Sequence, residues 1–360
     1  MSPPIDQATA VRDGETLDLD SLRAWFAASV PDLAGKPVTL AQFPKGHSNL
    51  TYLLNVGGQA LVLRRPPFGT RAKSAHDMGR EFRILSALQG HYLLAPEAIA
   101  FCEDESVLGA PFYLMQRLEG LIVRKRLPEG VPGDPDAMGE MSRAFVDNMV
   151  AIHAVDWQAA GLSDLYRGEG YVARQISGWT RRYDKAQTDE IATVNQVATW
   201  LAENLPVEAV PTLIHNDYKH DNLVLDPADP TRIIGVLDWE MATVGDPLMD
   251  LGTTLGYWIE TNDPAQVQAF AFCPSNRPGM YSRQQLVDAY QQTSGREVAT
   301  PVFYFVYGLF KLAVVAQQIY QRFKLGHSKD PRFASFIFGV RMLTDLAARA
   351  IDKGRINNLG

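Results

Sequence analysis

The spacing of apolar residues changes character once along this 360-residue chain, near Gly120, and the change limits the folds it can adopt. Before Gly120, residues 38–65 read as three short strands, with turns at Gly46 and at 57–58. Two more strands are expected at about 95–102 and 111–118, and a helix at about 78–90 follows the third strand. The first part of the chain is therefore predicted to form an antiparallel sheet with one helix.

After Gly120, the three- and four-residue spacing that is typical of helices dominates. At roughly 150 residues per domain, the length corresponds to two domains or lobes. We predict the α+β class, with a small antiparallel-sheet N-terminal lobe (residues 1–117) and a mostly helical C-terminal lobe (residues 118–360). The first 17 residues are polar and are expected to form a loose tail. Helices are expected at about 138–153, 171–184, 188–203, 283–293, 301–324 and 331–353, and short strands at 223–226 and 233–238.

Charge and cysteine content exclude several classes of function. The chain has 34 Lys and Arg against 41 Asp and Glu, a net charge of −7, which argues against nucleic acid as the main partner. Its two cysteines form no metal-binding pair and no disulfide framework, and the first 20 residues do not resemble a signal peptide, so we predict a cytoplasmic protein. The most apolar stretch, 302–316, is short and contains Lys311, so it predicts a buried helix and no membrane partner. Oligomeric state cannot be read from the sequence.

The strongest chemical signal lies between residues 213 and 250. Asp217 lies on an expected loop, Asn222 follows five residues later, and Asp238 ends the next strand. Phosphoryl transfer from ATP requires a carboxylate that orients the attacking hydroxyl and hard oxygen ligands that hold Mg²⁺ on the phosphates. Asp217 suits the first task, and Asn222 and Asp238 suit the second. Lys219 is placed to neutralise charge on the transferred group.

The motifs HNDYKHDN, LDWE and GDPLMDL resemble those of the aminoglycoside phosphotransferase and choline kinase family of the protein-kinase-like fold. The stretches GHSNLTYLL, LVLRRPP, REFRILSAL, PFYLMQRLEG and RQISGWTRRYDK are most similar to the kinase-like domains linked to acyl-CoA dehydrogenases and to their stand-alone bacterial relatives. The resemblance implies a two-lobed fold, ATP and Mg²⁺ as cofactors, and a small-molecule hydroxyl as acceptor. It leaves the choice between ATP and GTP open.

The resemblance also implies roles for individual residues. Asp217 would be the catalytic base, with Lys219 beside it, and Asn222 and Asp238 would be the magnesium ligands. His215 would steady the catalytic loop, and Asp246 and Asp250 would hold the segment after the metal site. The nucleotide would be bound by the loop residues Gly46, His47, Ser48 and Asn49, by Arg64 with its partner Glu81, and by Met115, Gln116 and Leu118 in the connection between the lobes.

Two positions depart from the usual family pattern. Arg64 stands where most kinases have a lysine, and its fork of donors is expected to meet phosphate with a different geometry. The alternative is that Arg64 and Glu81 form a purely structural ion pair. Asn216 stands where the family usually has glycine, and Asn is the least costly substitute if this position requires a positive φ.

The acceptor is predicted from the charges expected around it. Tyr304, Tyr307, Lys311 and Arg322 share one face of the expected 301–324 helix, and Arg174, Arg181 and Arg182 gather on an earlier helix. With Glu240, the four residues of the 301–324 helix are the predicted acceptor contacts. Such a face would suit an anionic acceptor, such as a hydroxyacyl-CoA or a hydroxy acid, better than an aminoglycoside, and a choline-like acceptor stays open. The alternative is that these basic residues are ordinary solvated side chains.

Two other classes of protein compete with a small-molecule kinase. A pseudokinase would bind nucleotide without transferring phosphate, but such proteins usually lose a member of the catalytic set, and all three members are present here. A protein kinase would carry a long activation segment and an Ala-Pro-Glu triplet after Asp238, whereas GDPLMDL follows almost at once. The sequence therefore favours a small-molecule acceptor.

Overall fold

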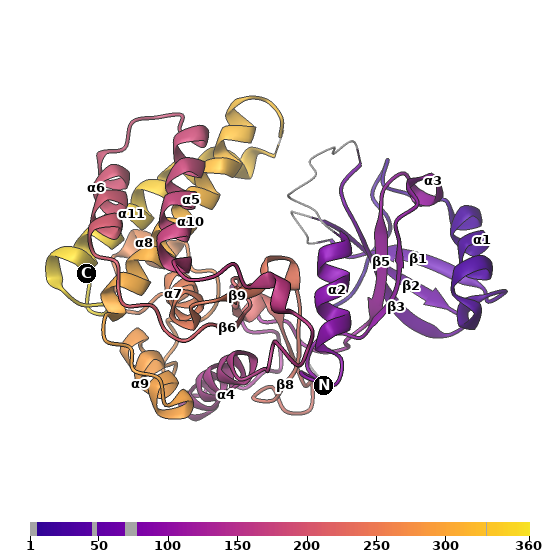
Figure 1. The fold of residues 1–360 in the computed structure, drawn as a ribbon, viewed down its shortest axis with the longest axis horizontal. Coiled ribbons are helices and arrows are strands. Elements are labelled where there is room, and N and C mark those ends of the chain that lie inside the picture. The colour runs from indigo at the N-terminus through magenta and orange to yellow at the C-terminus, as the bar shows by residue number, and fades with distance from the viewer. Residues whose placement is uncertain (1–5, 45–48, 69–77, 329) are drawn as a thin grey trace.

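The computed structural model describes residues 6–44, 49–68, 78–328 and 330–360, and it shows two lobes side by side (Figure 1). The N-terminal lobe contains a five-stranded antiparallel sheet in the order β1-β2-β3-β5-β4. The predicted small antiparallel lobe followed by a helical lobe is confirmed. The strands are β1 (Val38–Gln42), β2 (Leu50–Val56), β3 (Gln59–Arg65), β4 (Ala98–Cys102) and β5 (Phe112–Gln116).

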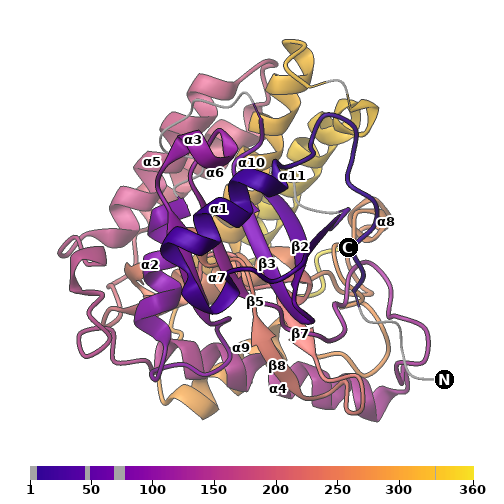
Figure 2. The ribbon, with the colours of Figure 1, turned by 90° about the vertical axis from the view of Figure 1, so that its right-hand side faces the viewer.

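The two faces of this sheet have different partners because side chains alternate along a strand. Leu61 and Leu63 of β3 are buried in the N-terminal core, whose far face is covered by α1 (Leu19–Ser29) (Figure 2). Val62 belongs to the core cluster that continues into the C-terminal lobe. Arg64 therefore leaves the sheet on the side where α2 (Met78–Leu88) lies between the sheet and the C-terminal lobe (Figure 1).

Residues 6–17 correct the prediction of a loose N-terminal tail. Thr9 pairs with Gln42 at the edge of the sheet through two backbone hydrogen bonds, of 2.8 and 2.9 Å. The backbone carbonyl of Glu15 accepts a hydrogen bond of 2.7 Å from the Tyr52 hydroxyl, and Leu17 is buried. Polar composition alone suggested disorder, but these residues extend the sheet edge and cover part of its core.

The C-terminal lobe is built around α10 (Pro301–Lys324), which packs against α5, α7 and α11. By length and apolar composition α10 could cross a membrane, but 72% of its most apolar window is buried, as in the core helix of a folded domain. The prediction of a buried helix here is confirmed. The other helices are α4 (Pro135–His153), α5 (Tyr171–Ala186), α6 (Ala192–Glu203), α7 (Pro247–Tyr257), α8 (Ala265–Ala269), α9 (Arg283–Ser294) and α11 (Phe336–Lys353), with the short α3 (Glu105–Leu108) in the N-terminal lobe.

Two small sheets of the C-terminal lobe frame the predicted catalytic segment. In the first, β6 (Thr212–Ile214) pairs with β9 (Thr243–Gly245). In the second, β7 (Leu223–Leu225) pairs with β8 (Ile233–Val236). The loop 215–222 connects β6 to β7, so both of its ends are anchored in hydrogen-bonded strands.

Candidate active site

The catalytic loop begins with two backbone amides that share one buried carboxylate. Asp250 of α7 accepts hydrogen bonds from the amide of His215 at 2.8 Å and from the amide of Asn216 at 2.7 Å. The His153 Nε2 atom lies 3.2 Å from the same carboxylate. Although burial opposes ionisation, the contact with His153 and the hydrogen bond from the His215 backbone amide hold the pKa of Asp250 below 3.8. An ionised Asp250 therefore anchors the start of the catalytic loop, whereas the resemblance had assigned it to the segment after the metal site.

His215 and Asn216 shape the next turn. His215 Nε2 lies 2.9 Å from the Leu237 carbonyl, which can only accept, so this nitrogen carries the proton. Its Nδ1 is then free to accept from the Asp217 amide at 3.3 Å. Asn216 has φ of 66°, so this position does adopt the left-handed conformation for which Asn is the least costly substitute for glycine.

Three donors surround the Asp217 carboxylate. The Tyr257 hydroxyl donates to Oδ1 at 2.8 Å, Lys219 Nζ lies 2.9 Å from Oδ2, and the Asn222 amide donates to Oδ2 at 3.1 Å. Burial disfavours the charge on Lys219, but the neighbouring Asp217 carboxylate outweighs this and raises the pKa of Lys219. The side chain of Asp217 retains 17% exposure, so it is oriented but still reachable.

The two predicted metal ligands are neighbours across the β7–β8 hairpin. The Leu237 amide donates to the Asn222 carbonyl at 2.8 Å, which places Asp238 beside Asn222. Asp238 has φ of 69°, a left-handed turn after β8. Burial opposes its charge, yet Arg64 and Lys219 keep the pKa of Asp238 below 3.8. The side-chain amide nitrogen of Asn222 donates to Asp217, which leaves the side-chain carbonyl oxygen of Asn222 as the ligand for a cation.

This oxygen donor set fits Mg²⁺. Magnesium commonly takes one or two protein ligands and completes its shell with water and phosphate oxygens, so it does not need a cage made by the protein alone. The residues that the structure describes contain no group of three or more His, Cys, Asp or Glu side chains arranged to hold a metal. Asn222 and Asp238 are therefore suited to Mg²⁺ that arrives with a nucleotide.

Arg64 connects the two lobes at this site. Its Nη1 donates to Glu81 Oε1 at 2.7 Å, and its Nη2 donates to Asp238 Oδ1 at 3.1 Å. Burial disfavours its charge, but Glu81 and Asp238 more than compensate and raise the pKa of Arg64. The buried Arg64 Nε has no hydrogen-bond partner among the described residues. An unpaired, buried guanidinium donor fits an added phosphate oxygen.

The predicted phosphate loop is only partly described. Gly46, His47 and Ser48 lie outside the described residues. Asn49, which follows them, donates from Nδ2 to Glu240 Oε2 at 2.8 Å. Burial and the neighbouring Asp238 raise the pKa of Glu240 to about 8. The structure therefore joins Glu240, predicted as an acceptor contact, to residues on the nucleotide side.

The connection between the lobes begins at the end of β5, at Gln116. Met115 is buried in the sheet, and the backbone amide of Gln116 donates to the Glu97 carbonyl at 2.8 Å. Leu118 packs against Gly235 of β8, where any side chain on the glycine would collide with it. The chain then joins the C-terminal lobe through the Leu121–Leu225 bridge, close to the predicted boundary at residue 117.

The predicted acceptor face of α10 is not an exposed surface. Tyr304, Tyr307 and Lys311 are at most 3% exposed and lie within the helical core. Arg322 is exposed, but it lies 11 residues beyond Lys311, about 16 Å along the helix axis at 1.5 Å per residue. Helical spacing placed these residues on one stripe, but α5 and α7 cover most of it. Among them, Lys311 reaches the catalytic loop, donating from Nζ to the Asn216 carbonyl at 2.6 Å.

Two residues of the site were missed by sequence reasoning. Tyr257 lies at the end of α7, 40 residues after the carboxylate that it contacts, and no spacing rule links the two. Arg80 of α2 donates to the carbonyls of Glu240 and Ala242, both at 2.5 Å, and so ties the N-terminal lobe to the metal-site turn. REFRILSAL was recognised, but nothing in it marked its first residue, Arg80, as an interlobe contact.

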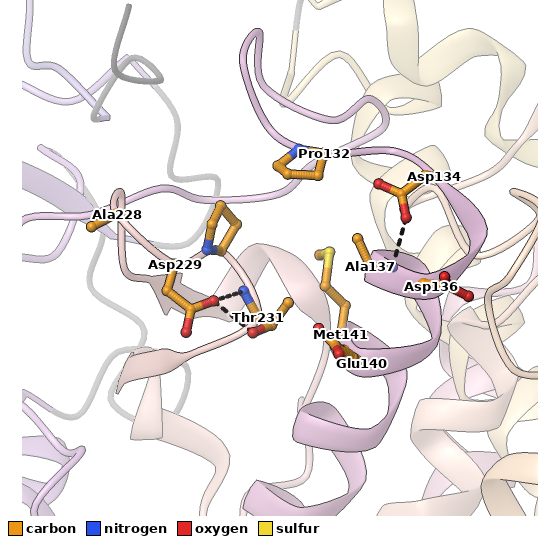
Figure 3. Close-up of a pocket in the computed structure, with 10 residues that line it drawn as sticks. Pro132, Asp134, Asp136, Ala137, Glu140, Met141, Ala228, Asp229 and Thr231 are labelled. Carbon is orange, nitrogen blue, oxygen red and sulfur yellow. Dashed lines mark hydrogen bonds between the residues drawn. The ribbon is translucent and has the colours of Figure 1, made fainter.

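A hollow of about 410 Å³ lies elsewhere, between the start of α4 and the β7–β8 hairpin (Figure 3). Its acidic lining residues are Asp134, Asp136, Glu140 and Asp229. Asp134 caps α4 through the amide of Ala137, and Asp229 caps its own turn through Thr231. The hollow contains none of the predicted nucleotide, metal or acceptor residues, so it is separate from the candidate active site.

The chain is similar in sequence to part of several longer known proteins. Acyl-CoA dehydrogenase family member 11 of Gallus gallus is 32% identical over 350 residues, which cover 95% of this chain and 44% of the relative. The human family member 11 is 34% identical over 84% of this chain and 38% of the relative. A probable acyl-CoA dehydrogenase of Arabidopsis thaliana is 30% identical over 90% of this chain and 41% of the relative. The chain thus spans less than half the length of these relatives.

Solved structures with a similar fold cover almost the whole chain. A Ralstonia eutropha structure assigned as an aminoglycoside phosphotransferase matches with a TM-score of 0.78 and 30% identity, covering 94% of this chain and 99% of that one. A choline kinase from Cryptosporidium parvum matches with a TM-score of 0.65 and 13% identity, covering 95% and 98%. The two-lobed protein-kinase-like fold predicted from the sequence is therefore confirmed. Because the family described as phosphotransferase enzymes matches residues 39–281, well over half of the chain, the protein belongs to the phosphotransferase enzyme family.

Proposed function

We propose that the protein is a small-molecule kinase that transfers the γ-phosphoryl group of ATP, bound with Mg²⁺, to a hydroxyl group of its acceptor. The observation that carries this proposal is the constellation of Asp217, Asn222 and Asp238, all partly or fully buried and linked by hydrogen bonds across one hairpin. Each residue supplies the oxygen or carboxylate chemistry that phosphoryl transfer requires. The family match supports the same class of reaction.

Asp217 orients the acceptor hydroxyl and accepts its proton as the bond to phosphorus forms. Tyr257 and Lys219 hold the two oxygens of this carboxylate in place before the acceptor arrives. Preorganised donors of this kind cost no reorientation during the reaction. Lys219 also places a positive charge beside Asp217, where it would offset negative charge on the transferred phosphoryl group.

Asn222 and Asp238 would hold Mg²⁺, which when bound neutralises charge on the nucleotide phosphates. Arg64 would turn its unpaired Nε donor toward a phosphate oxygen while Glu81 keeps the guanidinium in place. Arg64 also contacts Asp238 at 3.1 Å, and a cation at Asp238 competes with this contact. With Mg-nucleotide bound, Arg64 would give up its contact with Asp238 and donate to a phosphate oxygen instead.

The acceptor that we propose is a hydroxyacyl thioester of coenzyme A. Two observations support it. The relatives that match this chain are named acyl-CoA dehydrogenases and extend beyond the matched region. The exposed Arg182 lies over the Trp179 ring at 4.3 Å on α5, the helix that packs against α10, and offers a charge to an anionic group. Choline and an aminoglycoside are the competing acceptors.

The test is ATP turnover with Mg²⁺ against kanamycin, choline, homoserine, and 3- and 4-hydroxyacyl-CoA. Asp217→Asn should abolish acceptor-dependent ADP release while it leaves nucleotide binding within about twofold, because it removes the base and no phosphate contact. Asp221→Asn is the matched control. This carboxylate lies in the same loop, but it is 44% exposed and its distance to Lys219 Nζ is 3.9 Å, longer than the 2.9 Å of Asp217. Full turnover by Asp217→Asn would overturn the assignment. Tight ATP binding without turnover on any acceptor would favour a pseudokinase.

A further inference from the structure

Lys311 is a buried charge that the proposed phosphoryl transfer does not explain. It lies in the middle of α10 with 3% exposure, among apolar neighbours in the core of the C-terminal lobe. Burying an ammonium group costs several kcal/mol unless it is well paired, so a methionine or leucine would pack here at lower cost. No carboxylate is within ion-pair distance of Lys311 among the described residues, and its partners are a carbonyl and a hydroxyl. Because burying this ammonium group costs stability, we looked for a functional role for Lys311 in its contacts.

The contacts of Lys311 point to the catalytic loop. Its Nζ donates to the backbone carbonyl of Asn216 at 2.6 Å and lies 3.3 Å from Thr253 Oγ1 of α7. The Asn216 carbonyl belongs to the peptide that joins Asn216 to Asp217. At the other end of Asn216, its amide donates to Asp250 at 2.7 Å. Lys311 and Asp250 therefore hold Asn216 from its two backbone ends.

This restraint acts at a point where the backbone needs it. Asn216 has φ of 66°, a region that side-chain-bearing residues populate at a cost, so the surroundings must maintain it. Fixing the plane of the peptide between Asn216 and Asp217 also fixes the direction of the Asp217 amide, which lies 3.3 Å from His215 Nδ1. A change in this plane would move the Asp217 carboxylate away from Tyr257 and Lys219.

We propose that Lys311 is a positioning residue that holds the peptide before Asp217 and so sets the orientation of the catalytic carboxylate. The inference rests on the proposed function, because it assigns Lys311 a task in that reaction. It also removes Lys311 from the set of acceptor contacts that the sequence suggested. The ammonium acts through the loop backbone and does not touch the acceptor.

The charged groups around Lys311 make the arrangement sensitive to pH. Asp217 and Lys219 face it from the catalytic loop, Asp250 from α7 and Arg182 from α5. Burial is the largest effect and lowers the pKa of Lys311 to about 8, with the two carboxylates opposing and the two cations reinforcing this shift. Above this pH the residue loses its charge and holds the Asn216 carbonyl more weakly. A fall in kcat on the alkaline side of pH 8 is the expected signature.

The test compares Lys311→Met with Gln317→Met, a matched control on the same helix. Gln317 is equally buried, but its amide donates to Ala186 and Thr188 at the end of α5 instead of to the catalytic loop. Lys311→Met should lower kcat at least about 30-fold, change KM for ATP less than about twofold, and leave the thermal midpoint equal or higher. Gln317→Met should keep kcat within about twofold. Lys311→Arg stays charged throughout this pH range, so the fall in its kcat should begin at a higher pH than in the wild type.

Amide hydrogen exchange gives a second readout that does not depend on turnover. In Lys311→Met, exchange should accelerate at residues 215–217 and stay unchanged at 186–188, whereas Gln317→Met should show the reverse. Unchanged exchange at 215–217, or wild-type kcat and pH profile in Lys311→Met, would overturn the inference even if the kinase assignment stands. If the wild type shows no turnover, the proposed function fails, and the exchange pattern alone decides whether Lys311 positions the loop.

Discussion

Tyr257 illustrates how one hydroxyl can orient a carboxylate, here that of the proposed base Asp217. It donates to Asp217 Oδ1 at 2.8 Å while Lys219 lies over its ring at 4.9 Å, so it contacts both the base and the cation beside it. Tyr257→Phe removes the hydrogen bond and keeps the ring. We expect kcat to fall about tenfold, or about 1.4 kcal/mol, because a hydrogen bond to a charged group is lost. Steady-state kinetics measures this, with Tyr320→Phe on α10 as the control; unchanged kcat would show that Tyr257 has no part in orienting Asp217.

Whereas Tyr257 is expected to affect kcat, Asp250 is expected to affect the free energy of unfolding. Asp250→Asn should lower the free energy of unfolding by about 2–4 kcal/mol at pH 7, because a buried ionised acceptor of two backbone amides and His153 is neutralised. Its folded-state pKa lies below 3.8, so its contribution is complete above that pH and is lost as the pH falls through the folded-state value. Denaturant titrations from pH 7 to pH 3 should show the two proteins converging in acid. A difference that grows on acidification would contradict the assignment.

At the scale of elements, the crossing of α7 and α10 depends on glycine. Gly308 of α10 lies against the backbone of Gly252, and a Cβ added there would collide with the Gly252 carbonyl. Gly308→Ala should therefore destabilise the protein by about 1–3 kcal/mol by overpacking. Gly339→Ala on α11 is the control, because its added Cβ meets nothing within 4 Å and should stabilise the helix by about 0.5–1 kcal/mol. Thermal unfolding distinguishes the two variants. Equal midpoints would show that α7 and α10 can move apart to accommodate the added methyl group without loss of stability.

The elements differ in how far the sequence predicts them. The helices α5, α9 and α10 follow from long apolar periodicity, and their observed bounds lie close to the predicted ones. The strands β6 and β9 have three residues each, too few for a period of two to be recognised. Residues 6–17 were assigned as a loose tail because their composition is polar. Their order comes from pairing with Gln42, a contact between distant segments that composition does not reveal.

At the scale of the whole molecule, the two lobes meet through residues of the proposed nucleotide site. Arg64, Asn49 and Arg80 of the N-terminal lobe contact Asp238, Glu240 and the turn that follows them. Mg-ATP should therefore stabilise both lobes together. At 100 times its Kd, binding should add about 2.7 kcal/mol to the free energy of unfolding. The thermal midpoint with ATP should rise with Mg²⁺ and fall back with EDTA; a midpoint that ignores Mg-ATP would contradict the nucleotide site.

The spacing of the motifs by itself determined much of the chemistry. The residues His215, Asp217, Asn222 and Asp238 lie within 24 positions of one another, and a loop and a hairpin bring such neighbours together with little help from the rest of the chain. Their residue types specify hard oxygen ligands and a base, so the family and the fold class could be predicted from the sequence, and Asn222 and Asp238 stay predicted metal ligands. A cytoplasmic location stays a prediction from the sequence.

Only the tertiary structure decided which distant residues serve this motif. Tyr257 and Lys311 lie 40 and 94 positions after Asp217, and their roles arise because α7 and α10 pack beneath the catalytic loop. Helical spacing predicted correctly that Tyr304, Tyr307 and Lys311 share a stripe, but it could not say that neighbouring helices bury it. Periodicity reports which residues lie on one face of a helix. What covers that face depends on how the helices pack, which is a property of the whole chain.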